Sequence, residues 1–390
     1  MPKKLRHTIL VLDLLNTSTL QREDGRNDFI KLLEKGVTGN QPVSLVCITK
    51  NGLKLIRSFA TDPASVIDDL KKLPLGAETI VARVNRVIGT INQVRDIAQA
   101  YAGISGRKTM IFAASDLPEL ATEDEIVETS TYAGDLHRMW KNLNNANISI
   151  YPIILLDWAR NNGRGPASRL DIRMRNFAAA TGGNECLEAN ELMRCLASAV
   201  DDSRSYYMLG FSVQPDDRKP GWRDLKVKVA AEHVDVRARD GFYFGEPAPS
   251  NSKSVRDQEV NSLASALPMT AVPMFVKAMP SAAQGSGEKK TIEFLITLPL
   301  TSVDVDMSVS LPLNLELGAI ALTRDHREAG EFVQPVSGNP KPENLETWAR
   351  EGIKLQQKLD LPPGSYDIRI FARDNNSGQI GTVVFPLDVN

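Results

Sequence analysis

Between residue 8 and about residue 200, short apolar runs alternate with longer, helix-like segments. Apolar runs without polar alternation are typical of strands buried on both faces of a parallel sheet. The runs lie at 8–15, 42–50, 108–115 and 148–157. The Asn-Gly pair at 51–52 predicts a hairpin, so residues 53–60 would add one antiparallel edge strand. This part of the chain is therefore predicted to form an α/β fold, a mostly parallel sheet covered by helices on both faces.

The segments between these runs place apolar residues at helical spacing. They predict helices at about 18–36, 63–73, 79–103, 129–146, 170–180 and 189–202. From residue 205 the pattern changes to three strand-like stretches, "SYYMLGFSV", "DLKVKVAA" and "HVDVRARDGFYF". They predict a β-rich extension of the same domain, which would span residues 1–245.

The remainder of the chain is predicted to form a second domain. The Pro- and Ser-containing stretch "GEPAPSNSKS" is typical of a linker, which we place at 246–264. About seven short strand signals follow over 265–390 and predict a β-sandwich. Tyr366 follows a Pro-Gly turn and opens a strand in which Ile368 and Ile370 share its face. This resembles the tyrosine corner of immunoglobulin-like sandwiches, so an all-β, immunoglobulin-like sandwich is predicted.

Composition narrows the classes of function. Hydrophobic residues make up 42% of the 390 residues and the formal net charge is −2, which argues against a broad electrostatic surface for nucleic acid. No apolar run approaches the roughly 20 residues that a membrane-spanning helix needs. The basic N-terminus "MPKKLRHTILVLD" lacks a long apolar region and predicts no signal peptide in the chain as given. Cys47 is expected to be a buried thiol, and a disulfide between Cys186 and Cys195 is left open.

The stretch "VLDLLNT" places a carboxylate, Asp13, inside an apolar run. A buried carboxylate is costly without a partner, and two interpretations are open. Asp13 is either the first ligand of a metal site at the carboxyl end of a strand or the cap of its own loop, with Thr17 or Ser18 capping the next helix. Ligands of open parallel sheets bind beyond the carboxyl ends of the strands. Thr79 and Asp116 are expected at the same edge, and two carboxylates with two hydroxyls would suit Mg²⁺.

The order of strands, helices and loops resembles a von Willebrand factor A (VWA) domain, a mostly parallel Rossmann-type sheet. It resembles a bacterial "VWFA-related" subgroup more closely still. The hallmarks of that subgroup are matched by "FAAATGG" (177–183), "YYMLGF" (206–211) and "VRARDGFY" (236–243). The resemblance covers roughly residues 5–245, and the sandwich resembles, more loosely, the β-rich tail often attached to this subgroup.

The resemblance implies a metal-ion-dependent adhesion site, with the pattern D-x-S-x-S, a loop Thr and a later Asp. Leu15 stands where the motif has its first serine and offers no oxygen. Ser115 aligns with the later Asp, and a one-residue slip brings Asp116 there instead. Affinity for a hard cation depends on the number of charged ligands, so the implied Mg²⁺, or Ca²⁺ or Mn²⁺, would be held weakly or not at all. The ligands implied for this degenerate site are Asp13, Thr17, Thr79 and Asp116.

These observations predict a non-enzymatic protein-binding, adhesion-type module. The VWA-like domain would recognise a protein partner through the loops at the carboxyl edge of its sheet, with or without a bridging cation. The alternative is a structural subunit of a homo- or hetero-assembly, with contacts through strand edges and the sandwich. No nucleophile–base pair can be named in the sequence, so an enzyme is not expected. Members of the subgroup are usually exported, which implies a location in the periplasm, at the cell surface or outside the cell.

Overall fold

The structure is a computed structural model. It describes residues 7–17, 19–36, 42–75, 83–115, 132–155, 169–186, 197–199, 201–202, 206–211, 213, 219, 221–231, 233–234, 236–245, 262–263, 265, 267–284, 289–305 and 311–390.

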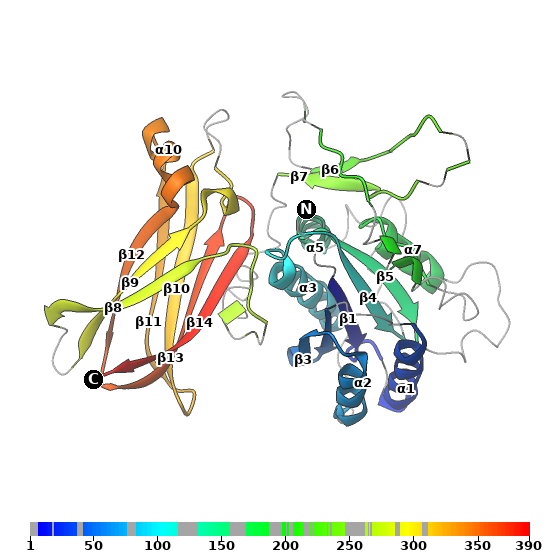
Figure 1. Cartoon of the computed structure of the whole chain (residues 1–390), viewed down its shortest axis with the longest axis horizontal. Coiled ribbons are helices and arrows are strands. Elements are labelled where there is room, and N and C mark those ends of the chain that lie inside the picture. The colour runs from blue at the N-terminus through cyan, green and yellow to red at the C-terminus, as the bar shows by residue number, and fades with distance from the viewer. Residues whose placement is uncertain are drawn as a thin grey trace. The chain divides into compact units, whose positions relative to one another are not determined.

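A five-stranded sheet forms the centre of the first part of the chain (Figure 1). Its strand order is β3-β2-β1-β4-β5, with β1 in the middle. The strands β1, β2, β4 and β5 run parallel, and β3 pairs antiparallel with β2. The predicted mostly parallel sheet with one antiparallel edge strand is therefore confirmed. The strands are β1 (His7–Asp13), β2 (Val43–Thr49), β3 (Gly52–Ala60), β4 (Lys108–Ala114) and β5 (Ile148–Ile154).

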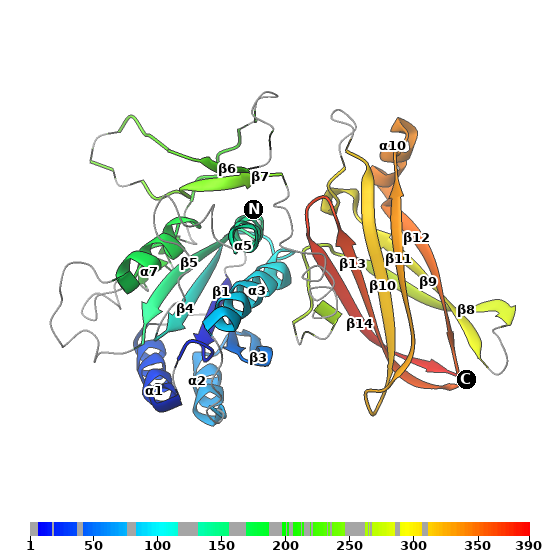
Figure 2. The same cartoon turned by 180° about the vertical axis from the view of Figure 1, so that it is seen from behind.

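Helices cover both faces of this sheet, as expected (Figures 1 and 2). Apolar residues of α1 and α2 join a core with alternate residues of β1 and β2, such as Leu10 and Leu45. On the opposite face, Phe177 of α7 packs against Phe112 of β4 and Trp140 of α5, with ring centroids 5.2 and 5.1 Å apart. The helices are α1 (Thr19–Gly36), α2 (Pro63–Lys72), α3 (Arg83–Tyr101), α5 (Ala133–Asn145) and α7 (Arg169–Ala179). Of the helix predicted at 189–202, residues 197–199 and 201–202 are helical, and most of the rest lies outside the described residues.

The β-rich extension is smaller than the sequence predicts. In its described residues only β6 (Gly221–Asp224) and β7 (Gly241–Phe244) pair, antiparallel, over four residues each. The predicted strand "SYYMLGFSV" has no regular ladder in its described part, residues 206–211 and 213. Just before β7, Asp240 donates its N–H to the Ala179 carbonyl at the end of α7, and its own carbonyl accepts from the N–H of Leu225, the residue after β6. This segment is therefore hydrogen-bonded both to the α/β layers and to the neighbouring segment of the extension.

The C-terminal part is the predicted β-sandwich. One sheet has the order β11-β10-β13-β14 and the other β12-β9-β8. Apolar residues of both sheets, among them Phe294, Leu317 and Ile370, form one core. The helix α10 (Pro342–Glu351) and the short 3₁₀ helix η2 (Leu300–Ser302) lie between strands in the sequence. The strands are β8 (Phe275–Gln284), β9 (Lys290–Leu298), β10 (Leu313–Thr323), β11 (Glu328–Gly338), β12 (Ile353–Leu361), β13 (Gly364–Asp374) and β14 (Ile380–Val389).

The sequence predicts the tyrosine corner of the sandwich but not its edge strand β11. The Tyr366 hydroxyl donates a hydrogen bond of 2.8 Å to the Pro362 carbonyl, as a tyrosine corner requires. The strand β11 was not anticipated, because its polar sequence "EAGEFVQPVSG" is that of an exposed edge strand. One of the seven strand signals in the sequence is "VDMSVSLPL" at 305–313, and its residues 306–310 lie outside the described residues. The specific likeness to immunoglobulin-like sandwiches stays a prediction.

The chain divides into two compact units. One comprises Met1–Ala98 and Ser105–Ser250, and the other comprises Gln99–Ile104 and Asn251–Asn390. Most of the linker predicted at 246–264 lies outside the described residues. Among the helices of the described part, none is long and apolar enough to span a membrane.

Candidate functional site

The carboxyl ends of the parallel strands open onto a set of loops that we call the rim. Asp13 ends β1 at this edge and is fully buried. Its Oδ1 accepts hydrogen bonds from the backbone N–H groups of Leu15, at 2.9 Å, and Asn16, at 3.0 Å. Its Oδ2 accepts one from the Asn16 side-chain amide at 2.6 Å. The rim consists of residues 14–17, 50–51, 73–75, 115 and 155.

This pattern is that of an aspartate that caps its own turn. The Thr17 hydroxyl closes the turn by donating to the Asp13 carbonyl at 2.5 Å. Three N–H donors of the loop therefore satisfy the buried carboxylate, which removes most of the cost of burying it. The sequence left two interpretations of Asp13 open, and its hydrogen bonds are those of a residue that caps its own loop. The Thr17 hydroxyl bonds this turn and, among the described residues, does not cap the following helix.

A residue that sequence reasoning missed completes the loop. Thr90, fully buried on α3, accepts a hydrogen bond of 2.8 Å from the Asn16 side-chain amide. Its own hydroxyl donates to the Arg86 carbonyl one helical turn earlier, at 2.9 Å. The available signal was a hydroxyl residue among apolar ones in "RVIGTINQV". Asn16 therefore links the Asp13 carboxylate to α3.

The position of the motif's first serine has a packing role. Leu15 is 8% exposed. A Cβ placed on Gly89 of α3 would lie 3.0 Å from its Cδ2 atom, so the side chain rests closely on that helix. An apolar contact thus occupies the place where the family motif has an oxygen ligand.

Of the other residues predicted at the metal site, the structure describes Ser115 only. Thr79 and Asp116 lie outside the described residues. Ser115, at the end of β4, has a buried hydroxyl with no hydrogen-bond partner. Because β4 is the direct neighbour of β1 in the sheet, this hydroxyl belongs to the same edge as Asp13.

A positive charge is also fixed beside the rim. Arg22, in the first turn of α1, is half-buried and donates hydrogen bonds to the backbone carbonyls of Thr17, Leu14 and Leu75, at 3.2, 2.9 and 2.8 Å. These bonds tie the loop after β1 to the segment after α2. The guanidinium opposes the binding of a second cation nearby, because like charges repel.

The described residues do not fit a tightly held divalent cation. They offer one carboxylate, whose two oxygens already accept three hydrogen bonds, and the hydroxyls of Thr17 and Ser115. Charge count and the number of free oxygen ligands set the affinity for Mg²⁺ or Ca²⁺. No group of three or more His, Cys, Asp or Glu side chains in the described part of the chain is placed to hold a metal ion.

The cysteines do not form a reactive site among the described residues. Cys47 is a free, fully buried thiol, as expected. Burial, with a smaller contribution from Asp13, outweighs the opposing effect of Lys54 and raises its pKa to about 12, so the nucleophilic thiolate is scarce. Cys186 is disulfide-bonded, and Cys195 lies outside the described residues.

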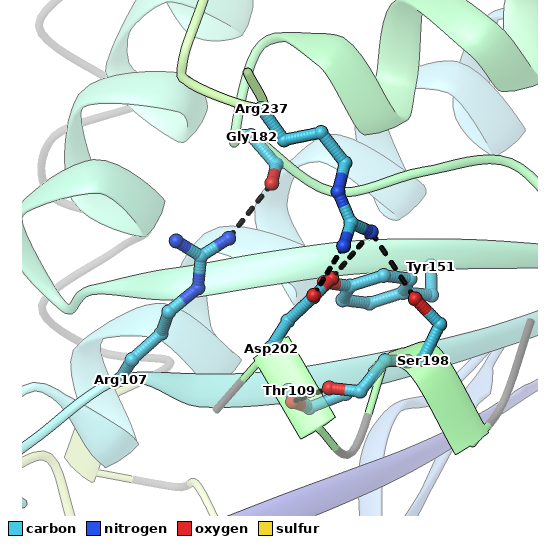
Figure 3. Close-up of polar contacts among 8 residues, drawn as sticks. Arg107, Thr109, Tyr151, Gly182, Ser198, Asp202 and Arg237 are labelled. Atoms are coloured by element: carbon cyan, nitrogen blue, oxygen red, sulfur yellow. Dashed lines mark hydrogen bonds and ion pairs between the residues drawn. The ribbon is translucent and has the colours of Figure 1, made fainter. Parts of the chain in front are cut away.

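The motif "VRARDGFY" attaches the extension to the sheet (Figure 3). Arg237 makes a bidentate ion pair with Asp202, which also accepts a hydrogen bond of 2.5 Å from the Tyr151 hydroxyl of β5. Burial, then Asp202, raises the pKa of Tyr151. Arg239 donates to the Asn147 side chain at 3.2 Å, and burial, with the nearby charge of Arg107, lowers its pKa to about 10. These arginines hold elements together at the edge opposite the rim.

The glycines of "FAAATGG" allow the segment after α7 to pack closely against the sheet. Gly182 ends α7 in the left-handed conformation, with a φ of 69°, and its carbonyl accepts a hydrogen bond of 2.7 Å from Arg107. A Cβ on Gly183 would lie 1.9 Å from the Ile150 carbonyl oxygen of β5. Only glycine permits this close approach, so the motif is explained by packing.

Comparisons with known proteins concern the fold. No family model matches the chain, and no curated protein matches it. An aerotolerance-related membrane protein from Bacteroides fragilis is similar in structure, with 13% identity, a TM-score of 0.32, and coverage of 51% of this chain and 98% of that chain. Proximal thread matrix protein 1 from the mussel byssus, solved with a zinc-occupied MIDAS (metal-ion-dependent adhesion site) motif, is also similar in structure. It has 13% identity and a TM-score of 0.30, and the match covers 50% of this chain and 47% of that chain.

A glycosyl hydrolase family 2 member from Bacteroides cellulosilyticus has 10% identity and a TM-score of 0.20, covering 30% of this chain and 14% of that chain. Identities this low concern the fold alone. The strand order and the flanking helices described above give the first unit its VWA-like fold, followed in the chain by a β-sandwich.

Proposed function

We propose that this chain is a non-enzymatic, protein-binding module of the adhesion type that recognises a protein partner through the rim. One observation carries the proposal: the loop after β1 is held by its own hydrogen bonds through Asp13 and Asn16 and by Arg22. A loop that is already ordered loses little conformational entropy on binding. Contact with the partner is then direct, and a cation is not required.

The distribution of titratable groups supports a binding role over catalysis. Catalytic groups of open parallel sheets lie beyond the carboxyl ends of the strands. The buried His7 and Lys108, whose pKa values are strongly lowered, begin β1 and β4 and so lie at the amino edge. The described rim residues include no pair of a nucleophile and a base.

A location outside the cytoplasm belongs to the same proposal. Disulfides persist mainly in oxidising compartments such as the periplasm or the cell exterior. The disulfide at Cys186 supports such a location.

Site-specific photo-crosslinking tests the proposal. A benzophenone amino acid replaces Asn51 or Pro74, two exposed rim residues, or Ser105, an exposed residue at the amino edge. We expect the same protein to be captured from positions 51 and 74 and not from 105, with equal yield in EDTA and in millimolar Mg²⁺.

Two results would count against this proposal. Loss of the crosslink in EDTA would restore a cation-bridged mechanism. Crosslinks between copies of the chain from all three positions would favour the structural-subunit alternative.

A further inference from the structure

A cavity on the outer face of the sandwich has the composition of an anion site. It has a volume of about 250 Å³ and lies within the second unit. Arg369 of β13 and Thr382 and Val384 of β14 form its floor. Ser262, Ser265 and Pro268 line its wall.

The guanidinium of Arg369 is the cation in this cavity. Arg369 points away from the sandwich core, because its neighbours Ile368 and Ile370 are the residues buried there. Its Nη1 donates a hydrogen bond of 2.6 Å to the Leu263 carbonyl. Its Nε is buried and has no acceptor, and no carboxylate pairs with Arg369 among the described residues. A half-buried guanidinium with unused N–H donors favours the binding of an anion that accepts hydrogen bonds from them.

The other lining groups indicate which anion fits. A guanidinium binds the planar carboxylate through two parallel hydrogen bonds. The hydroxyls of Ser265 and Thr382 already accept backbone N–H groups, at 3.1 and 2.8 Å, and retain their own protons to donate. Val384 and Pro268 provide apolar surface for a short hydrocarbon stem. The volume equals that of about eight water molecules, below the range of about 300 to 1,000 Å³ usual for larger ligands.

We propose that this pocket binds a carboxylate group on a short aliphatic stem, with Arg369 as its main partner. The carboxylate is carried by a small organic acid or by an acidic side chain of another protein. This site is separate from the rim and does not depend on the function proposed there.

Titration of the full chain tests the proposal. The probes are propionate and a glutamate-containing peptide with blocked ends, and the readouts are the NMR signal of the Arg369 side chain and titration calorimetry. A ligand of five non-hydrogen atoms that forms a bidentate ion pair is expected to bind with a Kd of about 1 to 10 mM. Saturation by propionate alone identifies a small acid, and saturation by the peptide alone identifies a protein side chain.

Two variants and one control separate binding from folding. Arg369→Gln is expected to weaken the binding of the active probe at least about tenfold, the effect of losing one charge-assisted pair. Val384→Glu keeps Arg369 but places a carboxylate directly opposite it in the ladder, so it is expected to block the site to the same extent. Val333→Glu changes an exposed valine of β11 in the same sheet and is expected to bind like the wild type.

The proposal is overturned if neither probe saturates the Arg369 signal by about 100 mM, ten times the weakest expected Kd. It is equally overturned if Val384→Glu and Val333→Glu bind alike, or if Arg369→Gln binds as the wild type does.

Discussion

At the scale of single residues, polar side chains are buried at both edges of the parallel sheet, and they are stabilised in different ways. At the carboxyl edge the Asp13 carboxylate receives three hydrogen bonds from its own loop. At the amino edge, burial lowers the pKa of Lys108 to about 8, and burial together with Lys108 lowers the pKa of His7 to about 4. The second edge therefore makes stability depend on pH.

His7 gives the first testable expectation. The folded state holds it neutral down to about pH 4, whereas the unfolded chain binds its proton near pH 6.5. Between these values the unfolded state binds more protons, so the free energy of unfolding falls as the pH is lowered, by about 2 kcal/mol from this residue at about pH 5. Urea unfolding at about pH 7.5 and about pH 5 measures the loss. His7→Gln is expected to show a smaller fall, and an equal fall in both proteins would contradict the assignment.

The sequence could identify Asp13 and Thr17 but not the arrangement they adopt. An acidic residue in an apolar run marks a functional or capping position, and both roles use the same residue types. Thr90 was missed because its contact with Asn16 spans 74 residues and depends on how α3 packs over β1. The Cys186 disulfide was left open for the same reason, since pairing depends on distances that spacing does not give.

At the scale of elements, close backbone contacts position α7 and the extension against the sheet. Gly183 lies directly against the Ile150 carbonyl of β5. Beyond it, Arg237 pairs with Asp202, so the extension is bonded to the α/β layers. These contacts give structural roles to Gly183 of "FAAATGG" and Arg237 of "VRARDGFY".

Gly183→Ala is therefore expected to be strongly destabilising. The added Cβ would overlap the Ile150 carbonyl, so the backbone must shift, at a cost of about 3 kcal/mol. Gly338→Ala is the matched control, because a Cβ there meets nothing within 4 Å. Urea denaturation of both variants measures the difference. Equal stability of the two variants would show that the contact at Gly183 is not as close as described.

Elements with a strong hydrophobic pattern were predictable, and the others were not. The four parallel strands have continuous apolar runs, and residues 7–13 of β1 are buried throughout. The polar edge strand β11 and the mostly polar helix α10 contain no continuous apolar run. In the extension, "DLKVKVAA" alternates like a strand, yet β6 ends at Asp224, and residues 237–240 also bond to the α/β layers, through tertiary contacts that the sequence pattern does not show.

At the scale of the whole molecule, each unit has its own hydrophobic core. Leu10, Leu45 and their neighbours form one in the α/β unit, and Phe294, Leu317 and Ile370 belong to another in the sandwich. Separate cores predispose a protein to unfold in more than one step.

Calorimetry of the full chain is expected to show two transitions. Phe294→Ala removes a fully buried ring of the sandwich core and should lower one transition, through a loss of about 3 to 5 kcal/mol. Phe112→Ala, which removes a fully buried ring of β4, should lower the other. A single transition that moves in the same way in both variants would contradict independent cores.

We propose that Asp13 holds the rim loop through hydrogen bonds, without a contribution from a metal ion. Thermal unfolding of the wild type and Asp13→Ala in EDTA, and then in millimolar Mg²⁺, Ca²⁺ or Mn²⁺, tests this role of Asp13. We expect Asp13→Ala to lower the Tm equally in all conditions, because buried N–H donors lose their acceptor, and no cation to change the Tm of the wild type. A cation at about 100 times its Kd would add about 2.7 kcal/mol to stability, so a rise in the wild-type Tm that Asp13→Ala abolishes would contradict the claim.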